Sequence, residues 1–346
     1  MSIVIQVGLV GFGLSGRYFH TPFLSVNPRF RLKKIASSRP EAVHAFDAAI
    51  EWVATAEELF ADPTIDLVFI CTPNETHVDY ARQALEHKKH VVIEKPFALS
   101  EQEAHQLLEL ARKQERVVTA YQNRRWDSDF LTIKRLLAEG ALGNLVEFES
   151  RYDRYSPVNL RAQSWKEQAG AGRGNLYNLG PHLLDQVLHL FGTPDTVEAT
   201  IRIIRPDSRI NDYFDIKLGY SDKAARLKSS LLVYHNQLRY SLHGTGGSFI
   251  KNGLDAQEER LRLDQLPNDK ATWGTEPDDR WGMLYRDGRT ELIPSEQGNY
   301  MPFYDNLYEA IVNGAEPAIN STDIWQLARI IDLAVLSSEL KQTMPF

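Results

Sequence analysis

Over the first third of the chain, short apolar runs rich in Val and Ile alternate with amphipathic stretches. This alternation is typical of a parallel β-sheet whose faces are covered by helices. The last of the amphipathic stretches opens with Ser100 and has Glu103 three residues later, the pattern of a capping box. The expected strands are 3–10, 31–36, 67–71, 90–93 and 117–121, and the expected helices are 15–24, 41–47, 55–60, 75–87 and 100–114.

The pattern changes after about Asn123. Strand-like runs joined by short polar turns now predominate, which favours one mostly antiparallel sheet. Residues 255–287 are polar and rich in Pro, Gly and Trp, and are interpreted as a long surface excursion. We expect two domains, 1–123 and 124–346, with the C-terminal helices packing back on the first. The expected helices of the second part are 130–139, 304–313 and 322–340, and its strands are 145–155, 196–205, 213–220, 225–234 and 237–244.

Composition narrows the class of protein. The 346 residues are 43% hydrophobic with a net charge of −7, which suits a globular chain with two cores rather than a disordered one. No apolar stretch approaches the ~20 residues of a membrane helix, and the start lacks a signal-peptide pattern, so we expect a cytoplasmic protein. The acidic balance argues against nucleic acid. The one cysteine, Cys71, excludes an internal disulfide and is expected to be buried and inert.

A Gly-x-Gly-x-x-Gly pattern follows the first expected strand and opens the first expected helix. In such a loop the first glycine permits a tight turn, the second lets the backbone approach a pyrophosphate, and the third lets the helix pack on the strand. The context favours a nucleotide site over a merely structural turn. The expected cofactor-binding residues here are Gly11, Phe12, Gly13, Leu14, Ser15 and Gly16.

The residues after the second expected strand favour NADP over NAD. NAD sites usually carry an acidic residue about 20 residues after the glycine loop, to bind the ribose 2′-hydroxyl. No carboxylate occurs from Arg17 through Pro40, and the strand is followed by Ser37, Ser38 and Arg39. Hydroxyls and a guanidinium suit a 2′-phosphate. The alternative is that Arg39 is a solvated loop residue.

Two further segments carry a family resemblance. Residues 68–77 read Val-Phe-Ile-Cys-Thr-Pro-Asn-Glu-Thr-His, and residues 90–97 contain Glu94-Lys95-Pro96. The combination resembles the Gfo/Idh/MocA oxidoreductases nearly end to end, through 170–185 and 298–300. Residues 123–130 look most like a bacterial NADP-dependent branch that includes a scyllo-inositol dehydrogenase. The resemblance implies an N-terminal Rossmann domain, an α/β domain with a large open, mostly antiparallel sheet, and a homodimer or tetramer.

The resemblance also implies the chemistry, which is hydride transfer between a nicotinamide and a secondary alcohol or ketone. Lys95 would hydrogen-bond the reacting oxygen, in a Lys95–Pro96 turn whose peptide bond is frequently cis in the family; the alternative is a surface lysine. His182 would be the general acid or base, on a helix whose first turn holds Pro181. The alternative for His182 is a structural histidine that caps this helix.

Asn178 stands where the family usually has Asp, four residues before His182. A carboxylate there would raise the histidine pKa, whereas an amide carries no charge. We predict that Asn178 binds a substrate hydroxyl, the alternative being a helix N-cap. His182, Asp185 and His189 share a polar stripe that could also describe metal ligands, but the family has no metal here and none is expected.

Other positions follow from the resemblance, and each could instead be ordinary packing. Residues 72–77 follow a strand at the carboxyl edge, where ligands bind in open α/β sheets. The remaining substrate-binding candidates are Asn123 and Tyr300, and the remaining cofactor-binding candidates are Thr72, Pro73, Asn74, His77, Glu94, Lys95, Arg124, Trp165 and Lys166.

These observations favour an NADP-dependent dehydrogenase of a cyclitol, polyol or sugar, with scyllo-inositol suggested by the resemblance alone. A second hypothesis is a dinucleotide-binding regulator or sensor without turnover, which the presence of Lys95 and His182 disfavours. A third is NAD-assisted glycoside hydrolysis, which the Ser37-Ser38-Arg39 segment disfavours. The expected partners are a small hydroxylated substrate and further copies of the chain, and neither nucleic acid nor membrane.

Overall fold

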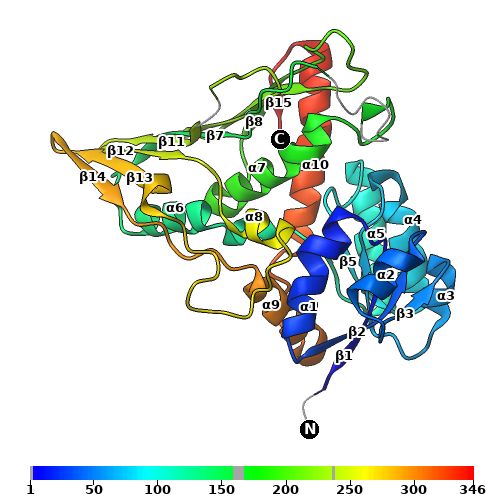
Figure 1. The fold of residues 1–346 in the computed structure, drawn as a ribbon. Coiled ribbons are helices and arrows are strands. Elements are labelled where there is room, and N and C mark those ends of the chain that lie inside the picture. The colour runs from blue at the N-terminus through cyan, green and yellow to red at the C-terminus, as the bar shows by residue number, and fades with distance from the viewer. Residues whose placement is uncertain (1–2, 159–166, 236–237) are drawn as a thin grey trace. The chain divides into compact units, whose positions relative to one another are not determined.

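The computed structural model describes residues 3–158, 167–235 and 238–346, and this described chain divides into two compact units (Figure 1). Unit 1 comprises Met1–Asn123, Gln257–Trp273 and Asn299–Trp325. Unit 2 comprises Arg124–Ala256, Gly274–Gly298 and Gln326–Phe346. The first change of unit therefore falls at Asn123, where the sequence pattern changes, but two later segments group with unit 1. Within the described ranges, none of the helices has the length and apolar composition needed to cross a bilayer.

Among the described residues, unit 1 holds a six-stranded parallel sheet in the order β3-β2-β1-β4-β5-β6. The strand order reverses at β1, and the carboxyl ends on either side of such a reversal form the usual ligand crevice. Short Val- and Ile-rich strands suit this sheet because helices cover both of its faces. The elements are β1 (Ile5–Val10), η1 (Gly16–His20), α1 (Thr21–Val26), β2 (Phe30–Ala36), α2 (Pro40–Phe46), β3 (Glu51–Val53), α3 (Ala56–Ala61), β4 (Leu67–Ile70), η2 (Asn74–Thr76), α4 (His77–Glu86), β5 (His90–Ile93), α5 (Glu101–Gln114), β6 (Val118–Ala120), α8 (Gln257–Arg262) and α9 (Met301–Asn313).

The α9 segment completes the core of unit 1 from the far end of the sequence. Its Tyr304 ring stacks on Phe23 with centroids 5.4 Å apart, and Phe303 meets the edge of Tyr121 at 4.9 Å. Such aromatic pairs add about 0.5–1.5 kcal/mol each beyond their buried area. The N-terminus of α5 is capped as expected, because Ser100 Oγ accepts a hydrogen bond from the backbone of the third helical residue at 3.2 Å.

In the described part of unit 2, a nine-stranded sheet runs in the order β14-β13-β12-β11-β7-β10-β9-β8-β15. Its pairings are antiparallel except for the parallel β7–β10 pair. Together with the Rossmann-type sheet of unit 1, this mixed sheet confirms the predicted fold class. The elements are η3 (Asn123–Trp126), which begins at the last residue of unit 1, α6 (Ser128–Ala138), β7 (Leu145–Arg151), α7 (Asn175–Phe191), β8 (Thr196–Arg202), β9 (Tyr213–Gly219), β10 (Ala224–Ser230), β11 (Leu238–Gly244), β12 (Gly247–Asn252), η5 (Asp278–Arg280), β13 (Gly282–Arg286), β14 (Arg289–Ile293), α10 (Ser321–Leu340), whose residues up to Trp325 belong to unit 1, and β15 (Met344–Pro345).

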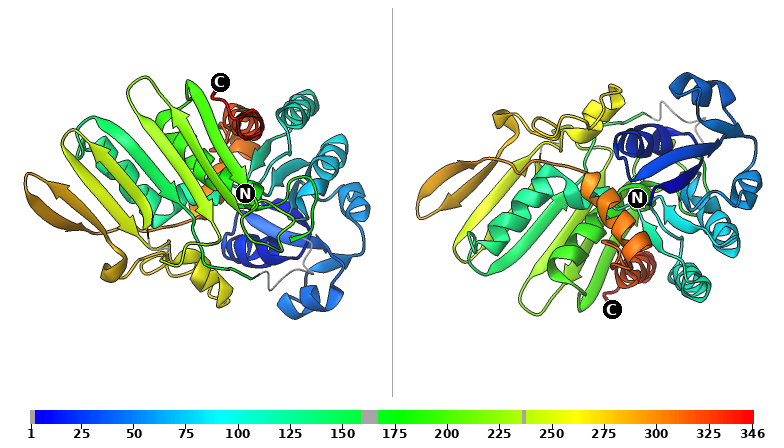
Figure 2. Two further views of the ribbon diagram at one scale, coloured as in Figure 1. Left: turned by 90° about the horizontal axis from the view of Figure 1, so that it is seen from above. Right: turned by 90° about the horizontal axis from the view of Figure 1, so that it is seen from below.

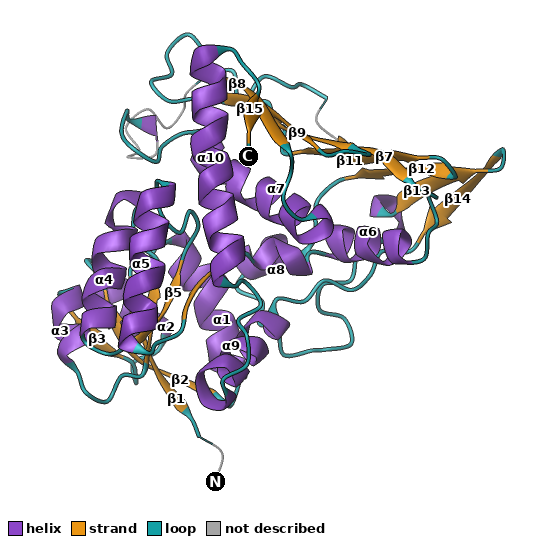
Figure 3. Ribbon diagram, turned by 180° about the vertical axis from the view of Figure 1, so that it is seen from behind, coloured by secondary structure: helices purple, strands orange, loops and turns teal. Residues whose placement is uncertain are grey.

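Helices α6 and α7 lie along one face of this sheet (Figures 2 and 3). The buried core beneath them includes Ile133 from α6, Leu183 and Val187 from α7, and Phe148 from β7. Ile330 of α10 belongs to the same apolar cluster. The spacing of Leu183 and Val187 is one helical turn, so α7 presents a continuous apolar stripe to the sheet.

Helix α7 begins earlier than the sequence predicts. It starts at Asn175, so Pro181 lies inside the helix and not in its first turn. The start is set by Gly174, whose φ of 93° is disfavoured for other residues, and by Asn211 from a distant loop. The Asn211 carbonyl accepts from the backbone N–H of Asn175 at 2.7 Å, and its side-chain oxygen accepts from that of Leu176 at 2.8 Å. A cap supplied from so far along the chain leaves no local sequence signal.

Residues 255–287 are a surface excursion only in part: residues 262–272 are exposed apart from Pro267, but several residues on either side of them are buried. In unit 1, Leu261 and Trp273 are buried, and the Trp273 indole donates to Gln257 Oε1 at 3.1 Å. In unit 2, Lys251 and Glu276 form an ion pair at 3.1 Å whose side chains have no exposed surface. The polar composition misleads because these polar groups satisfy one another inside the protein.

Candidate active site

The glycine loop after β1 has the geometry of a pyrophosphate cradle. Gly11 has a φ of 96°, and a Cβ at this position would lie 2.7 Å from the Cys71 carbonyl oxygen. A Cβ at Gly16 would collide with the Gly11 carbonyl, so the helix can approach the strand only with glycine there. A Cβ at Gly13 would meet nothing within 4 Å, which leaves its backbone open to a ligand. The three positions thus fit a bound dinucleotide.

The end of β2 lies beside this loop. The Arg39 guanidinium donates from Nη2 to the Phe12 carbonyl, and the Arg39 backbone N–H donates to Ser37 Oγ at 3.1 Å. Ser37 is buried, whereas Ser38 and Arg39 are exposed. A guanidinium has five N–H donors. Arg39 uses one of them to bind the Phe12 carbonyl, which orients its side chain, and the other donors remain able to bind an anion.

The segment after β4 holds Thr72, Pro73 and Asn74, all half-buried. The Thr76 hydroxyl lies 2.6 Å from Thr72 Oγ1 and 2.7 Å from the Pro73 carbonyl, and so it stiffens the turn into η2. Cys71 is buried, and burial raises the pKa of its thiol, in keeping with the expected inert role.

His77 braces the neighbouring turn rather than facing open space. Its Nδ1 is 2.8 Å from the Pro96 carbonyl and its Nε2 is 3.0 Å from the Thr72 carbonyl. Burial lowers the pKa of His77, so the neutral ring donates to one carbonyl at a time. The predicted contact between His77 and the cofactor therefore does not fit this structure, because backbone groups occupy both ring nitrogens.

Glu94, Lys95 and Pro96 follow β5, and the Lys95–Pro96 peptide bond is cis, as the resemblance implies. Glu94 is 8% exposed, and its Oε2 accepts from the Lys95 backbone N–H at 3.1 Å. Burial alone would raise the pKa of Glu94. The hydrogen bond and the electrostatic interaction with His20, and after them the charge of Lys95, outweigh burial and bring the pKa of Glu94 below its usual value, so Glu94 is a carboxylate.

His20 and Tyr304 were not among the predicted site residues, yet hydrogen bonds connect both of them to Glu94. His20 ends the π-helix η1 and has no exposed surface; its Nε2 lies 3.0 Å from Glu94 Oε1 and its Nδ1 lies 3.0 Å from Tyr304 Oη. The signal available in the sequence was a histidine in the helix directly after the glycine loop. The π-helical turn adds to it, because such turns are frequent at functional sites.

In unit 2, Asn178 and His182 lie one turn apart inside α7, so neither caps the helix. Asn178 is exposed, whereas His182 is buried with its ring centroid 6.5 Å from that of Tyr152. Asp185, three residues after His182, forms a buried two-point ion pair with Arg125, at 2.8 and 2.7 Å. The polar residues along α7 therefore do not converge on one point: His182 lies beside Tyr152, whereas Asp185 pairs with Arg125.

The remaining predicted residues fall in several places. Asn123 is buried at the end of unit 1. Arg124 begins unit 2, where it forms an ion pair with Asp127 at 3.4 Å. Tyr300 was predicted to bind substrate, but its side chain is fully buried. Its ring centroid lies 5.8 Å from that of Phe23. The structure does not describe the positions of Trp165 and Lys166.

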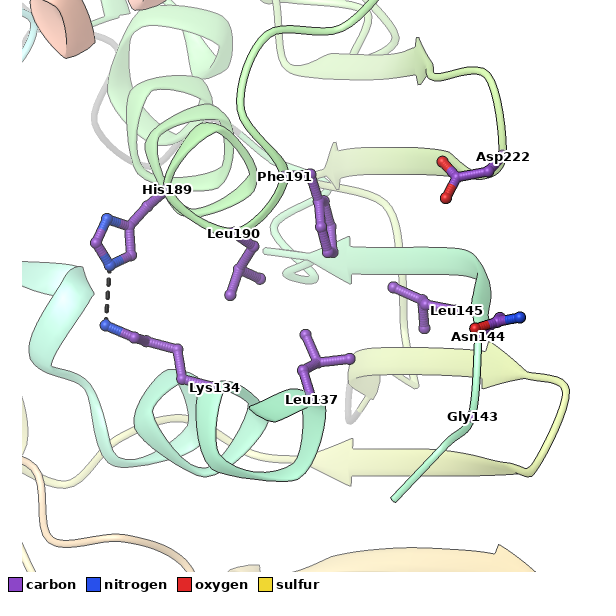
Figure 4. Close-up of a pocket in the computed structure, with 9 residues that line it drawn as sticks. All are labelled: Lys134, Leu137, Gly143, Asn144, Leu145, His189, Leu190, Phe191 and Asp222. Carbon is purple, nitrogen blue, oxygen red and sulfur yellow. Dashed lines mark hydrogen bonds between the residues drawn. The ribbon is translucent and has the colours of Figure 1, made fainter. Parts of the chain in front are cut away.

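A pocket of about 440 Å³ in unit 2 lies apart from these residues (Figure 4). Lys134 and His189 are hydrogen-bonded at 2.9 Å at one end, and Asp222 lies at the other. No residue predicted to bind cofactor or substrate lines it. Its other lining residues are Leu137, Gly143, Asn144, Leu145, Leu190 and Phe191.

Most candidate residues of unit 1 therefore gather at one edge of the parallel sheet. They follow the carboxyl ends of β1, β2, β4 and β5, which is where open α/β sheets bind their ligands. A Rossmann domain with an intact glycine loop, followed by an α/β domain, defines the class as a dinucleotide-binding oxidoreductase. Residues 5–122 match the NAD-binding Rossmann fold of an oxidoreductase family, and residues 134–346 match its C-terminal alpha/beta domain. The chain belongs to the Gfo/Idh/MocA oxidoreductase family.

Full-length relatives support this assignment. The chain is 38% identical to scyllo-inositol 2-dehydrogenase (NADP(+)) IolW of Bacillus subtilis, over 98% of this chain and 95% of that protein. It is also 38% identical to the oxidoreductase YdgJ of Escherichia coli, over 99% of both chains. Among solved structures, the yvaA oxidoreductase of Bacillus subtilis superposes with a TM-score of 0.95 at 38% identity, covering 100% of this chain and 99% of that one. The YPO2259 oxidoreductase of Yersinia pestis gives 0.92 at 40% identity, covering 100% and 98%.

Proposed function

We propose that this chain is an NADP-dependent dehydrogenase that interconverts a secondary alcohol and a ketone of a cyclitol, polyol or sugar, with scyllo-inositol as the first substrate to test. The observation that carries the proposal is the position of Lys95, directly after the carboxyl end of β5 and next to the buried carboxylate of Glu94. It is supported by 38% identity over 98% of the chain to a relative named as an NADP-dependent scyllo-inositol 2-dehydrogenase.

The preference for NADP rests on the end of β2. Ser37, Ser38 and Arg39 would bind the 2′-phosphate, because they offer two hydroxyls and a guanidinium where NAD sites carry an acidic side chain. The Phe12 carbonyl holds the guanidinium beside the glycine loop, which reduces the conformational freedom that Arg39 loses on binding. Gly11, Gly13 and Gly16 would hold the pyrophosphate.

In the proposed reaction, a C–H bond of the substrate gives up its hydride and the hydroxyl gives up its proton. When bound, the nicotinamide supplies the hydride acceptor. Negative charge develops on the substrate oxygen as the C–H bond breaks, and the Lys95 ammonium would stabilise that charge. The His182 imidazole would take the hydroxyl proton. Asn178 would hydrogen-bond a second hydroxyl of the substrate and so help to orient it.

Recognition by such groups implies a requirement for hydroxyls on the substrate. A site that pairs its donors and acceptors with hydroxyls discriminates strongly against an analogue that lacks one, because its own polar groups are then left unpaired. We therefore expect a deoxy-cyclitol to be a much poorer substrate than the parent cyclitol.

The test is the absorbance of the reduced nicotinamide during steady-state turnover, with NADP and NAD in parallel against inositols, aldoses and polyols. Turnover with NADP on one cyclitol or sugar is expected, and loss of it in Lys95→Ala and His182→Ala. The exposed residues Lys113 and His105 of α5 provide matched controls, so Lys113→Ala and His105→Ala should retain activity. A preference for NAD would contradict the role of Ser37 to Arg39. Tight NADP binding with no turnover on any substrate would favour a regulator or sensor.

A further inference from the structure

A buried chain of hydrogen bonds in unit 1 connects the helix after the glycine loop with the end of β5. His20 Nε2 lies 3.0 Å from Glu94 Oε1, and His20 Nδ1 lies 3.0 Å from Tyr304 Oη. The carbonyl of Phe19 has two hydroxyls within reach, that of Tyr304 at 2.8 Å and that of Tyr121 at 3.2 Å. His20 and Tyr304 have no exposed surface at all, and Glu94 is buried. This chain of groups leads to Lys95, whose backbone N–H binds the other Glu94 oxygen.

Two arrangements of the hydrogen atoms in this chain differ in the charge of His20. With a neutral ring, His20 donates from Nε2 to Glu94 and accepts at Nδ1 from the Tyr304 hydroxyl. The Phe19 carbonyl then accepts a hydrogen bond from the Tyr121 hydroxyl. With a protonated ring, both nitrogens donate, and the Tyr304 hydroxyl turns its hydrogen to the Phe19 carbonyl. An unsatisfied buried polar group costs about 1–3 kcal/mol, and neither arrangement leaves one here. His20 can therefore gain a proton without movement of any heavy atom.

Three ionisable groups near the His20–Glu94 pair, those of Tyr304, Cys71 and His77, are neutral. A change of charge in this region would therefore come from the His20–Glu94 pair itself. Burial raises the pKa of the Tyr304 phenol on α9 and of the Cys71 thiol after β4. Burial also lowers the pKa of His77 on α4. Tyr121, after β6, packs its ring 4.3 Å from that of His20 and donates its hydroxyl hydrogen. The fixed charges that face the pair are thus the carboxylate of Glu94 itself and the ammonium of Lys95.

We propose that His20 is a positioning residue that sets, through Glu94, the charge beside Lys95, and that its protonation is coupled to the oxidation state of the bound nicotinamide cofactor. This inference rests on the proposed function, in which Lys95 works next to the nicotinamide. The oxidised ring carries a positive charge that the reduced ring lacks. The anionic pair of Glu94 and neutral His20 favours the oxidised cofactor, and a proton on His20 cancels that preference.

The coupling can be measured without turnover. The dissociation constants of NADP⁺ and NADPH are determined by calorimetry on the full chain at a series of pH values over which the protein stays folded. Both cofactors carry the same 2′-phosphate, so its titration cancels in the ratio of the two constants. We expect the NADP⁺ to NADPH ratio to rise about tenfold toward low pH, the effect of one pK unit of coupling. In His20→Gln the amide still donates to Glu94 but takes up no proton, so the pH dependence of the ratio should be smaller than in the wild type.

His90 provides a matched control, because it lies at the other end of the same strand β5 and accepts the Val117 backbone N–H at 3.0 Å. His90→Gln should keep the wild-type pH dependence of the ratio. An unchanged pH dependence in His20→Gln would overturn the inference.

Nitrogen-15 NMR of the wild-type histidines tests the same coupling without any variant, should His20→Gln fail to fold. Because linkage is reciprocal, the midpoint of the His20 titration should lie at higher pH in the NADPH complex than in the NADP⁺ complex. Identical titrations in the two complexes would refute the coupling. Failure of the wild type to bind either dinucleotide would instead refute the proposed function, whereas binding without turnover leaves both readouts of the coupling intact.

Discussion

Replacing Arg39 with Ala should weaken NADP binding and leave NAD binding nearly unchanged. A guanidinium bond to a phosphate is charge-assisted, and such bonds contribute about 1.5–3 kcal/mol. Arg39 is exposed, which screens the interaction, so we take about 2 kcal/mol, equivalent to about 30-fold in the dissociation constant. The bond from Arg39 to the Phe12 carbonyl is lost in the free and the bound variant alike, so its loss largely cancels.

The assay is calorimetric titration of wild type and Arg39→Ala with NADP and with NAD at two salt concentrations. The wild-type preference for NADP should shrink as salt rises, because an exposed charge pair is screened. Arg112 is a matched control: it is exposed on α5 and pairs with Glu109 at 2.9 Å, away from the glycine loop. Arg112→Ala should bind both cofactors like wild type. Equal weakening of NADP and NAD in Arg39→Ala, or weakening of neither, would refute the assignment of the 2′-phosphate to Arg39.

Three other predictions concern stability and pH. Asp185→Asn leaves the buried guanidinium of Arg125 without its carboxylate and should lower the free energy of unfolding by about 3–5 kcal/mol, measured in urea. The pKa of His90 is lowered to about 4, chiefly by burial, so the unfolded chain takes up a proton that the folded one does not; about 3 kcal/mol of stability should be lost as the pH falls from about 6.5 to about 4. Asn178→Asp places a carboxylate one turn from His182 and should move the pH profile of alcohol oxidation to higher pH.

Each of these has its own control. Asp222→Asn removes an exposed carboxylate of unit 2 and should cost less than about 0.5 kcal/mol. His90→Gln should reduce the loss of stability between pH 6.5 and 4 by about 3 kcal/mol, leaving the part that comes from other groups such as His77, and a variant with the wild-type slope would contradict the role of His90. For position 178, Asn178→Gln keeps the amide without charge; a profile in Asn178→Asp that coincides with that of Asn178→Gln would rule out the electrostatic argument.

The parallel sheet of unit 1 could be predicted because β1, β4 and β5 are short runs rich in Val, Ile and Leu between amphipathic helices. The sheet of unit 2 was predicted only in part. β14, Arg289–Ile293, is exposed along most of its length, so it lacks the alternation of buried and exposed positions by which a strand is recognised. β3, Glu51–Val53, is three residues long and carries too few positions to show any period.

The candidate site divides in the same way. The glycine loop and the Glu94-Lys95-Pro96 segment could be recognised because each is a run of contiguous residues, and the cis Lys95–Pro96 bond was expected from the family resemblance. His20 could not be interpreted in this way, because its role depends on Tyr304, which lies 284 positions further on. The start of α7 depends on Asn211, and the burial of Tyr300 depends on packing against Phe23. Contacts of such long sequence separation leave no periodic signal in a single sequence.

The return of residues 257–273 and 299–325 to unit 1 has a consequence for how the chain is synthesised. The Tyr304 ring that packs on Phe23, Phe69 and Tyr121 leaves the ribosome only after nearly nine-tenths of the chain has been made. Until then the nascent dinucleotide-binding sheet has apolar rings exposed to water, and such surfaces favour aggregation and chaperone binding. A fragment ending at residue 123 lacks Tyr304, so we expect its sheet to be less stable than in the full chain. We therefore expect stable cofactor binding only after α9 has been translated.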